Sequence, residues 1–212
     1  MSGAVESEAF RDAERERQAD AFGMWIFIGS EAMLFGAVML VYLTARMAHP
    51  EGFGEASSRL SLLLGTVNTA VLITSSLAMA LADLLVKLGR RRAAAWALAA
   101  TALLGLAFLA VKGVEYADEV REGLAPVLGL PFAFEGADPR GAQLFFELYF
   151  ASTGLHAAHL IGGLAAIATV LATWRRSTDA ACLRRTRAVG LYWHFVDIVW
   201  VFLFPLLYLV HR

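Results

Sequence analysis

Cysteine and charge are both scarce in this chain of 212 residues. Cys182 is the single cysteine, which excludes an internal disulfide, a Cys-x-x-Cys metal site and a cysteine-held iron–sulfur cluster. Charged residues make up only 17% of the sequence, and the formal net charge of -1 argues against nucleic acid as a partner. No Gly-x-Ser-x-Gly, P-loop or Gly-x-Gly-x-x-Gly motif occurs, so hydrolytic and nucleotide chemistry find no support.

Hydrophobic residues are abundant instead, at 58% of the sequence, and they gather in five long blocks. Each block is long enough to cross about 30 Å of hydrocarbon as a helix. The blocks lie at about 22–45, 60–86, 93–111, 143–173 and 187–210. We therefore predict an all-α fold, a polytopic membrane protein with a bundle of five transmembrane helices. Residues 22–212 should form a single membrane domain, preceded by a charged cytoplasmic tail over residues 1–21.

Lys and Arg are distributed unequally between the two ends of the predicted bundle. Twelve of the 18 lie on the side that carries the N-terminus, so the positive-inside rule places the N-terminus in the cytoplasm and the C-terminus outside. Two arginine clusters between spans contribute most. Their simplest role is to set topology, with binding of anionic lipid headgroups as the alternative. The clusters are Arg90, Arg91 and Arg92, and Arg184 and Arg185.

The connection over residues 114–142 is the longest one between predicted spans. It contains three prolines, so we expect it to be irregular. It also carries six acidic residues, among them Glu115, Asp118 and Glu119, which this prediction places outside the bilayer. In the block that follows, small residues recur every four positions and predict close helix packing along one face. They are Gly154, Ala158, Gly162 and Ala166.

Two carboxylates interrupt the apolar blocks, Glu31 in the first and Asp197 in the fifth. A carboxylate at the bilayer centre costs about 2.5–3.5 kcal/mol on insertion scales, so such a residue usually has a buried partner or a function. Counting from the cytoplasmic ends places Glu31 about 13 Å deep and Asp197 about 15 Å deep at the rise of an α-helix. The two residues would share a level if their helices were neighbours.

Other polar residues also lie within the blocks, and three interpretations of them stay open. A His-x-x-His pair on a helix can supply two metal ligands. Chains of acidic and histidine side chains can relay protons through a membrane. Hydrogen bonds between helices can fix the bundle, which is the interpretation that we favour for the histidines and Asp197. The residues concerned are Asn68 in the second block, His156 and His159 in the fourth, and His194 in the fifth.

Five segments, taken in order, resemble subunit III of the haem–copper oxidase superfamily, which includes cytochrome c oxidases and bacterial quinol oxidases. The chain is similar to the five-helix bacterial form of that subunit. The segments are FGMWIFIGSEAMLF with Glu31, LGTVNTAVLITSS with Asn68, KGVEYADEV with Glu115 and Tyr116, STGLHAAHLIGG with His156 and His159, and YWHFVDIVWVFLF with His194 and Asp197.

The resemblance implies a non-catalytic subunit with neither catalytic nor metal-binding residues. Haem and copper would lie in the partner subunits, with subunit I in direct contact and subunit II in the same complex. Membrane phospholipid would bind to the chain, and the location would be the inner (cytoplasmic) membrane of a bacterium. Glu31 would be an intramembrane carboxylate linked to proton uptake. The bundle's polar network would consist of Asn68, Glu115, His156, His159, His194 and Asp197.

Two alternatives remain beside this reading. The first is an accessory subunit of a nitric oxide reductase or of a quinol oxidase. The second, from a different class, is a small proton-coupled transporter that uses Glu31 and Asp197. The sequence shows neither an inverted repeat nor a broken helix, which argues against the transporter.

Overall fold

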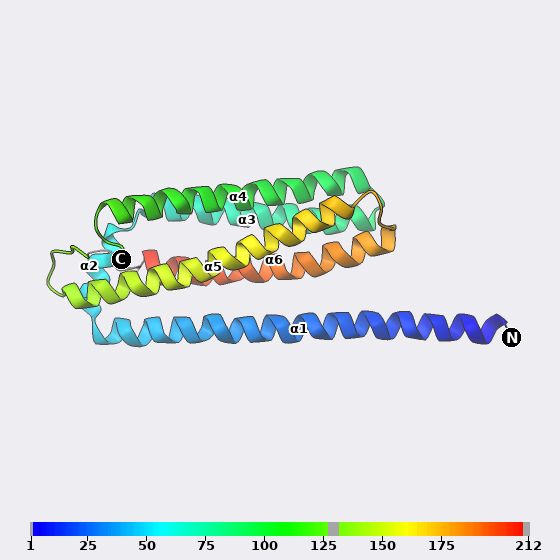
Figure 1. Ribbon diagram of the computed structural model, residues 1–212, viewed down its shortest axis with the longest axis horizontal. Helices are drawn as coiled ribbons and strands as arrows, with labels where there is room; N and C mark the ends of the chain where they lie inside the picture. The colour runs from blue at the N-terminus through cyan, green and yellow to red at the C-terminus, as the bar shows by residue number, and fades with distance from the viewer. Residues whose placement is uncertain (1, 127–131, 210–212) are drawn as a thin grey trace. The chain divides into compact units, whose positions relative to one another are not determined.

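The computed structural model describes residues 2–126 and 132–209, with side chains from residue 22 onward (Figure 1). The described residues form helices and no strands, which confirms the all-α prediction. The helices are α1 (Ser2–Ala48), α2 (Pro50–Arg59), α3 (Leu62–Lys87), α4 (Arg91–Arg121), α5 (Pro139–Thr173) and α6 (Asp179–Tyr208).

Five of these helices are long and apolar enough to cross a membrane, as predicted. In α1 the apolar part is Phe22–Ala48, whereas α3 to α6 qualify over their whole lengths. Among the spanning segments, the largest difference from the expected boundaries is in α4, which continues to Arg121 instead of ending near residue 111. Gly123 follows this helix with a φ of 71°, a conformation that glycine adopts without strain just beyond a helix end.

The longer α4 corrects the prediction for the connection after it. Glu115, Asp118 and Glu119 lie on the last turns of this helix and not in a loop, and Glu115 and Glu119 are buried. The spacing of 112, 115 and 119 puts three charged side chains on one helical face, where neighbouring helices can cover them. Only residues 122–138 connect α4 to α5.

The chain divides into two compact units, Met1–Gly36 and Ala37–Arg212. The first unit is the N-terminal part of α1. The second contains the end of α1, the short helix α2 and the four long helices α3 to α6. Within it, α3 packs against α4 and α6, and α5 packs against α6, α4 and α2. The α3–α4 and α5–α6 turns lie at the same end of this unit (Figure 1).

Helix α2 was not predicted; it begins at Pro50 and closes the opposite end of the second unit (Figure 1). Proline suits the first turn of a helix because its missing N–H would have no intrahelical partner there. Phe53 is fully buried, with its ring 5.5 Å from that of Phe145 on α5. Ser57 donates a hydrogen bond of 2.9 Å to the carbonyl of Leu207 on α6. These contacts fasten α2 onto two of the spanning helices.

Close packing between helices occurs around Trp193 and not along the predicted ridge on α5. A Cβ added at Gly105 on α4 would lie 2.7 Å from the Trp193 ring, and one added at Gly163 on α5 would lie 2.9 Å from it. By contrast, a Cβ at Gly154 would meet no atom within 4 Å, and one at Gly162 would meet only the Tyr192 hydroxyl, at 3.3 Å. The position of the Trp193 indole determines which helix faces pack closely. The spacing of small residues along α5 does not show where that indole lies.

Candidate functional site

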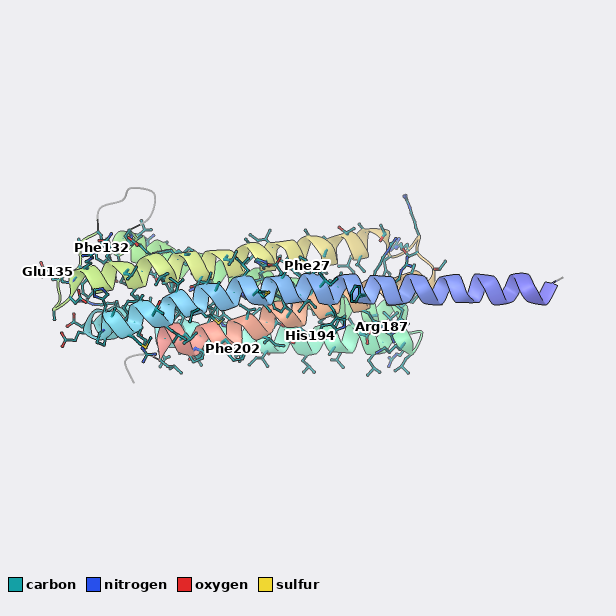
Figure 2. The ribbon with its side chains drawn as sticks, turned by 90° about the horizontal axis from the view of Figure 1, so that it is seen from below. Phe27, Phe132, Glu135, Arg187, His194 and Phe202 are labelled. Atoms are coloured by element: carbon teal, nitrogen blue, oxygen red, sulfur yellow. The ribbon has the colours of Figure 1, made fainter. Side chains whose placement is uncertain are left out.

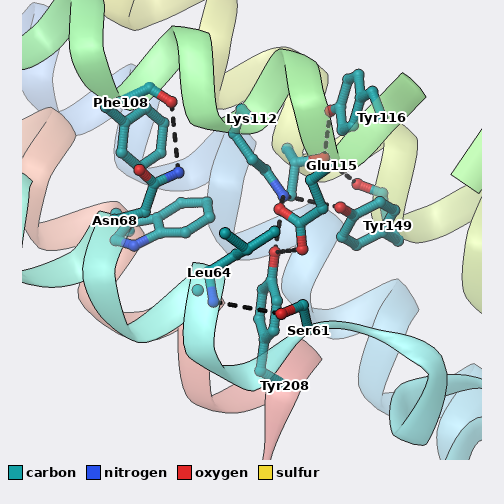
Figure 3. A network of polar contacts seen from close by, with 12 residues as sticks. Ser61, Leu64, Asn68, Phe108, Lys112, Glu115, Tyr116, Tyr149 and Tyr208 are labelled. Atoms are coloured by element: carbon teal, nitrogen blue, oxygen red, sulfur yellow. Dashed lines mark hydrogen bonds and ion pairs between the residues drawn. The ribbon is translucent and has the colours of Figure 1, made fainter. Parts of the chain in front are cut away.

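A lysine buried among the helices lies at the centre of a network of polar contacts in the second unit (Figure 3). The Lys112 side chain on α4 is only 4% exposed. Its Nζ donates to Glu115 Oε2 at 2.9 Å, to the Tyr149 hydroxyl at 2.8 Å and to the Tyr208 hydroxyl at 2.8 Å. An ammonium has three hydrogens to donate, so all of them are used. We name Lys112, Glu115, Tyr149 and Tyr208 the Lys112 cluster.

The carboxylate of the Lys112 cluster is engaged through both oxygens. The Tyr208 hydroxyl donates to Glu115 Oε1 at 2.6 Å while it accepts from Lys112. Residues from α4, α5 and α6 therefore meet at one buried ion pair. Removing either charge would leave the other buried and uncompensated, which is strongly destabilising.

Aromatic rings enclose the ammonium of Lys112. Its Nζ lies 4.5 Å from the ring centroid of Tyr149 and 5.4 Å from those of Tyr116 and Trp200. The electron-rich faces of such rings attract a cation, most effectively where water is excluded. The enclosure replaces part of the hydration that Lys112 loses on burial.

Further polar side chains surround the Lys112 cluster. The Tyr116 hydroxyl is hydrogen-bonded to Thr153 Oγ1, and Asn68 Nδ2 donates to the carbonyl of Phe108 at 3.3 Å. Glu119 faces the Tyr149 hydroxyl. Neither of its carboxylate oxygens has a described donor in hydrogen-bond geometry. Asn68 and Glu115, both named from the sequence, are thus near one another in the same region (Figure 3).

The two histidines of α5 have separate surroundings. His156 is fully buried, with its ring 5.5 Å from that of Phe108 and 5.1 Å from that of Trp200. His159 Nδ1 lies 2.8 Å from the carbonyl of Leu155 in its own helix. The described residues contain no group of three or more His, Cys, Asp or Glu side chains that could hold a metal ion.

His194 and Asp197 face α3 through the same serine. His194 Nδ1 lies 2.7 Å from Ser76 Oγ, and Asp197 also faces Ser76. Asp197 is 6% exposed, and neither of its carboxylate oxygens has a described donor in hydrogen-bond geometry. The structure therefore brings the predicted pair together on α6, at a polar contact with α3 and apart from the Lys112 cluster.

Glu31 belongs to the first unit, Met1–Gly36, where it lies on the apolar part of α1 with a half-buried side chain. The other predicted site residues all belong to the second unit. Of the arginines, Arg91 at the start of α4 donates to the carbonyl of Ser177 in the α5–α6 connection at 3.0 Å. Arg185 donates to Thr173 Oγ1 at 2.9 Å and to Ser177 Oγ at 3.0 Å. Three more arginines named from the sequence are exposed, namely Arg90, Arg92 and Arg184.

Sequence reasoning missed Lys112, Glu119, Tyr149 and Tyr208 as members or neighbours of a buried polar group. Lys112 lies just beyond the third predicted block, which ends at residue 111. Tyr208 lies near the end of the fifth predicted block, where a tyrosine also suits the membrane interface. The spacing of Lys112, Glu115 and Glu119 along one helical face was the available signal.

The sequence profile described as "Cytochrome c oxidase subunit III" matches residues 12–211. The chain is 31% identical to cytochrome c oxidase subunit 3 of Alkalihalophilus pseudofirmus, over 99% of this chain and 98% of that protein. It is 30% identical to cytochrome bo(3) ubiquinol oxidase subunit 3 of Pseudomonas aeruginosa, over 89% of this chain and 84% of that protein. It is 28% identical to the probable quinol oxidase subunit 3 of Staphylococcus aureus, over 92% of this chain and 90% of that protein. The chain therefore belongs to the cytochrome c oxidase subunit III family.

Proposed function

We propose that this chain stabilises the catalytic subunit I of a respiratory haem–copper terminal oxidase and supports proton uptake during oxygen reduction. The observation that carries the proposal is the family match over residues 12–211 on a chain with five helices able to span a membrane. The haem and copper of the complex would be held by partner subunits, with subunit I in direct contact and subunit II nearby. The complex would reside in the inner membrane of a bacterium.

Family membership favours an oxidase subunit over the proton-coupled transporter. The relatives named above include both a cytochrome c oxidase subunit and quinol oxidase subunits, so they support an oxidase role for either electron donor. The polar residues of the second unit fit this accessory role, because they join helices to one another. In the proposal they hold the bundle in the shape that subunit I recognises.

Glu31 is the residue that we assign to proton uptake. It lies in the apolar part of α1, where a carboxylate needs a functional or structural reason. The assignment concerns only the delivery of protons, since oxygen reduction would take place on the metals of subunit I. Glu31→Gln should slow proton uptake in the assembled oxidase and leave the haem spectrum unchanged.

The proposal is tested by comparing the oxidase purified with and without this chain. We expect the same haem content in both preparations and a similar initial rate of oxygen consumption. The preparation without the chain should lose activity sooner during sustained turnover and take up protons more slowly. Equal durability and equal proton uptake in the two preparations would contradict the proposal.

A further inference from the structure

Tyr208 holds its hydroxyl between a cation and a carboxylate within the Lys112 cluster (Figure 3). The hydroxyl accepts a hydrogen bond from Lys112 Nζ at 2.8 Å and donates one to Glu115 Oε1 at 2.6 Å. The second distance is typical of a charge-assisted bond from a hydroxyl to a carboxylate. The Tyr208 side chain is only 4% exposed, so both contacts are shielded from bulk water. This phenol therefore has a proton acceptor fixed at its own oxygen.

A fixed proton acceptor is what a tyrosine needs for reversible one-electron oxidation. A phenol that loses an electron also gives up its hydroxyl proton, and the electron returns easily only where that proton has stayed close by. Glu115 Oε1 is placed to take the proton because it already receives the Tyr208 hydrogen bond. Lys112 donates to the phenol oxygen and to Glu115 Oε2, so it holds acceptor and donor together. Glu119 is a second acidic side chain near the ammonium and stays beside it when Glu115 takes up the proton.

Aromatic rings connect Tyr208 to a less buried part of the bundle. Its ring centroid lies 6.5 Å from that of Tyr149, which in turn lies 6.0 Å from that of Tyr116. Rings at such separations belong to interacting pairs, and an electron passes readily between them. Tyr149 is fully buried on α5, whereas Tyr116 on α4 is half-buried. An electron vacancy formed at Tyr116 can therefore move inward to Tyr208.

The hydroxyl groups of two other tyrosines meet weaker proton acceptors. Tyr42 donates to the backbone carbonyl of Leu206, and the Tyr116 hydroxyl is hydrogen-bonded to Thr153 Oγ1. A carbonyl or a hydroxyl does not hold a proton at neutral pH, whereas a carboxylate takes one up readily. An oxidised ring with such a partner has nowhere to leave its proton. The electron vacancy is therefore expected to rest at Tyr208 and not at Tyr42 or Tyr116.

Tyr149 is the nearest competitor, since its hydroxyl faces Glu119. However, neither Glu119 oxygen has a described donor in hydrogen-bond geometry, whereas Tyr208 and Glu115 form a complete bond. Transfer of a proton requires a short and aligned hydrogen bond. Tyr149 thus serves as a step on the route, and Tyr208 as its end.

We propose that Tyr208 is a redox-active tyrosine that stores one oxidising equivalent. A one-electron oxidant takes an electron from the ring, the hydroxyl proton passes to Glu115 Oε1, and a neutral phenoxyl radical remains. A hydroquinone or another one-electron donor then returns the electron, and Glu115 returns the proton. One electron has then moved from donor to oxidant, and the protein is unchanged. Storage on a phenol spares methionine side chains, whose oxidation to the sulfoxide disrupts packed cores.

The oxidant belongs to the class of peroxide-derived one-electron oxidants that incomplete reduction of oxygen produces. Its supply by an oxygen-reducing partner subunit rests on the proposed function. The chemistry at Tyr208 does not, because it depends only on the residues of the Lys112 cluster. An oxidant added to this chain alone therefore tests the inference separately from membership of an oxidase.

The test uses the full-length chain in mild detergent. Flash photolysis of ruthenium tris-bipyridine with an irreversible electron acceptor generates a strong one-electron oxidant, and rapid freezing traps the products for EPR spectroscopy. We expect the spectrum of a neutral tyrosyl radical. Tyr208→Phe should lose this signal, whereas the control Tyr42→Phe should keep it in full. No tyrosyl radical in the wild type, or a signal that survives Tyr208→Phe, would overturn the proposal.

A second measurement leaves the hydroxyl in place, because Tyr208→Phe removes one acceptor of Lys112 and can unfold the chain. A tyrosine analogue with fluorine beside the hydroxyl, incorporated in place of Tyr208, keeps both hydrogen bonds. The fluorine nucleus splits the EPR lines only if the radical resides on the labelled ring. We expect this splitting with the label at Tyr208 and an unchanged spectrum with the label at Tyr42. Splitting from a label at Tyr149 or Tyr42 instead would overturn the assignment.

The destination of the proton is measured by infrared difference spectroscopy on the wild type. Formation of the radical should be accompanied by the carbonyl stretching band of a newly protonated carboxyl group, and the band should disappear in Glu115→Gln. A tyrosyl radical that forms without this band, or a band that persists in the variant, would overturn Glu115 as the proton acceptor.

Discussion

Lys112 shows at the scale of one residue how a charge is tolerated within this bundle. Its three donors meet one carboxylate and two hydroxyl groups, and aromatic faces cover the rest. Buried ion pairs are weak evidence for net stability, because desolvation offsets much of the attraction. Once formed, however, such a pair makes the presence of each partner essential for the other.

Lys112→Met should therefore destabilise the protein by about 3–5 kcal/mol, because Glu115 would stay buried without its cation. Thermal unfolding of the detergent-solubilised chain would measure the loss. The double variant Lys112→Met, Glu115→Gln should recover a large part of it. Lys87→Met is the control, since the Lys87–Asp83 pair is partly exposed and should contribute little. A Lys112 variant as stable as the control would show that the cluster is dispensable.

Asp138 offers a prediction about pH at the start of α5. The Gly141 N–H and the ring of His49 hold the pKa of this carboxyl below its usual range. A lowered folded-state pKa means that the ionised carboxylate stabilises the fold. That contribution is present above the unfolded pKa of about 3.9 and is lost as the pH falls through the folded value.

Asp138→Ala should accordingly lower the melting temperature at pH 7, because the helix cap and the contact with His49 are both lost. The difference from the wild type should shrink as the pH falls below about 4, where Asp138 of the unfolded chain takes up a proton, and should vanish at the lower pH at which the folded carboxylate does so. Asp138→Asn keeps an acceptor for Gly141 and should lie between the two at pH 7. A difference that stays constant with pH would contradict this role of the charge.

The tight slot around Trp193 is the feature that matters most at the scale of the helices. Its indole packs against Gly105 and Gly163, and its Nε1 donates to Ser75 Oγ at 3.0 Å. One side chain of α6 thus fixes the spacing of α3, α4 and α5. Any added atom in the slot must displace the indole from this hydrogen bond.

Gly105→Ala should cost about 1–3 kcal/mol through overpacking, measured again by thermal unfolding. Gly113 provides a control on the same helix, because a Cβ there would meet no atom within 4 Å. Gly113→Ala should be neutral or should stabilise by about 0.5–1 kcal/mol, since alanine is the better helix former. Equal effects of the two substitutions would rule out the slot.

Hydropathy alone could predict the five spanning helices, because each consists of a long apolar run that has no other stable place in the protein. It could not predict the end of α4, where burial of Lys112, Glu115 and Glu119 is decided by side chains from α5 and α6. It could not predict α2 either, since that helix depends on Phe53 reaching Phe145. The hydropathy pattern of one segment does not show which distant segments it will contact.

The same distinction between local pattern and distant contact applies to the candidate site residues. The resemblance to subunit III, now shown by the family match, singled out Asn68, Glu115 and His156 from motifs that survive in the sequence. Lys112 was not singled out, and its hydrogen-bond partners Tyr149 and Tyr208 lie 37 and 96 residues from it along the chain, so no local pattern joins them.

At the scale of the whole molecule, many large apolar side chains are exposed along the spanning helices. Phe202 projects from α6 with 58% of its surface exposed, and Leu103 on α4 and Leu63 on α3 are exposed still more (Figure 2). Such surface needs lipid or another protein against it. The polar contacts between helices then hold the arrangement of the bundle when it associates with that partner.

Asp197→Leu should weaken the retention of this chain in its complex, because it removes a polar contact between α6 and α3 near Ser76. Contacts of this kind within membranes contribute about 0.6 kcal/mol on average and up to about 1.7 kcal/mol. The content of the chain after detergent purification, relative to haem, measures the effect. Glu147→Leu is the control, because its side chain is exposed and bonds only to Gln143 among the described residues. Unchanged content in the Asp197 variant would refute its role.

The most direct measurement of the central claim is purification of the tagged, full-length chain from its native membranes in mild detergent. The account predicts that a haem-bearing polypeptide co-elutes in constant ratio and gives the absorption spectrum of a terminal oxidase. A haem-free homo-oligomer that moves protons or solute in vesicles would contradict it.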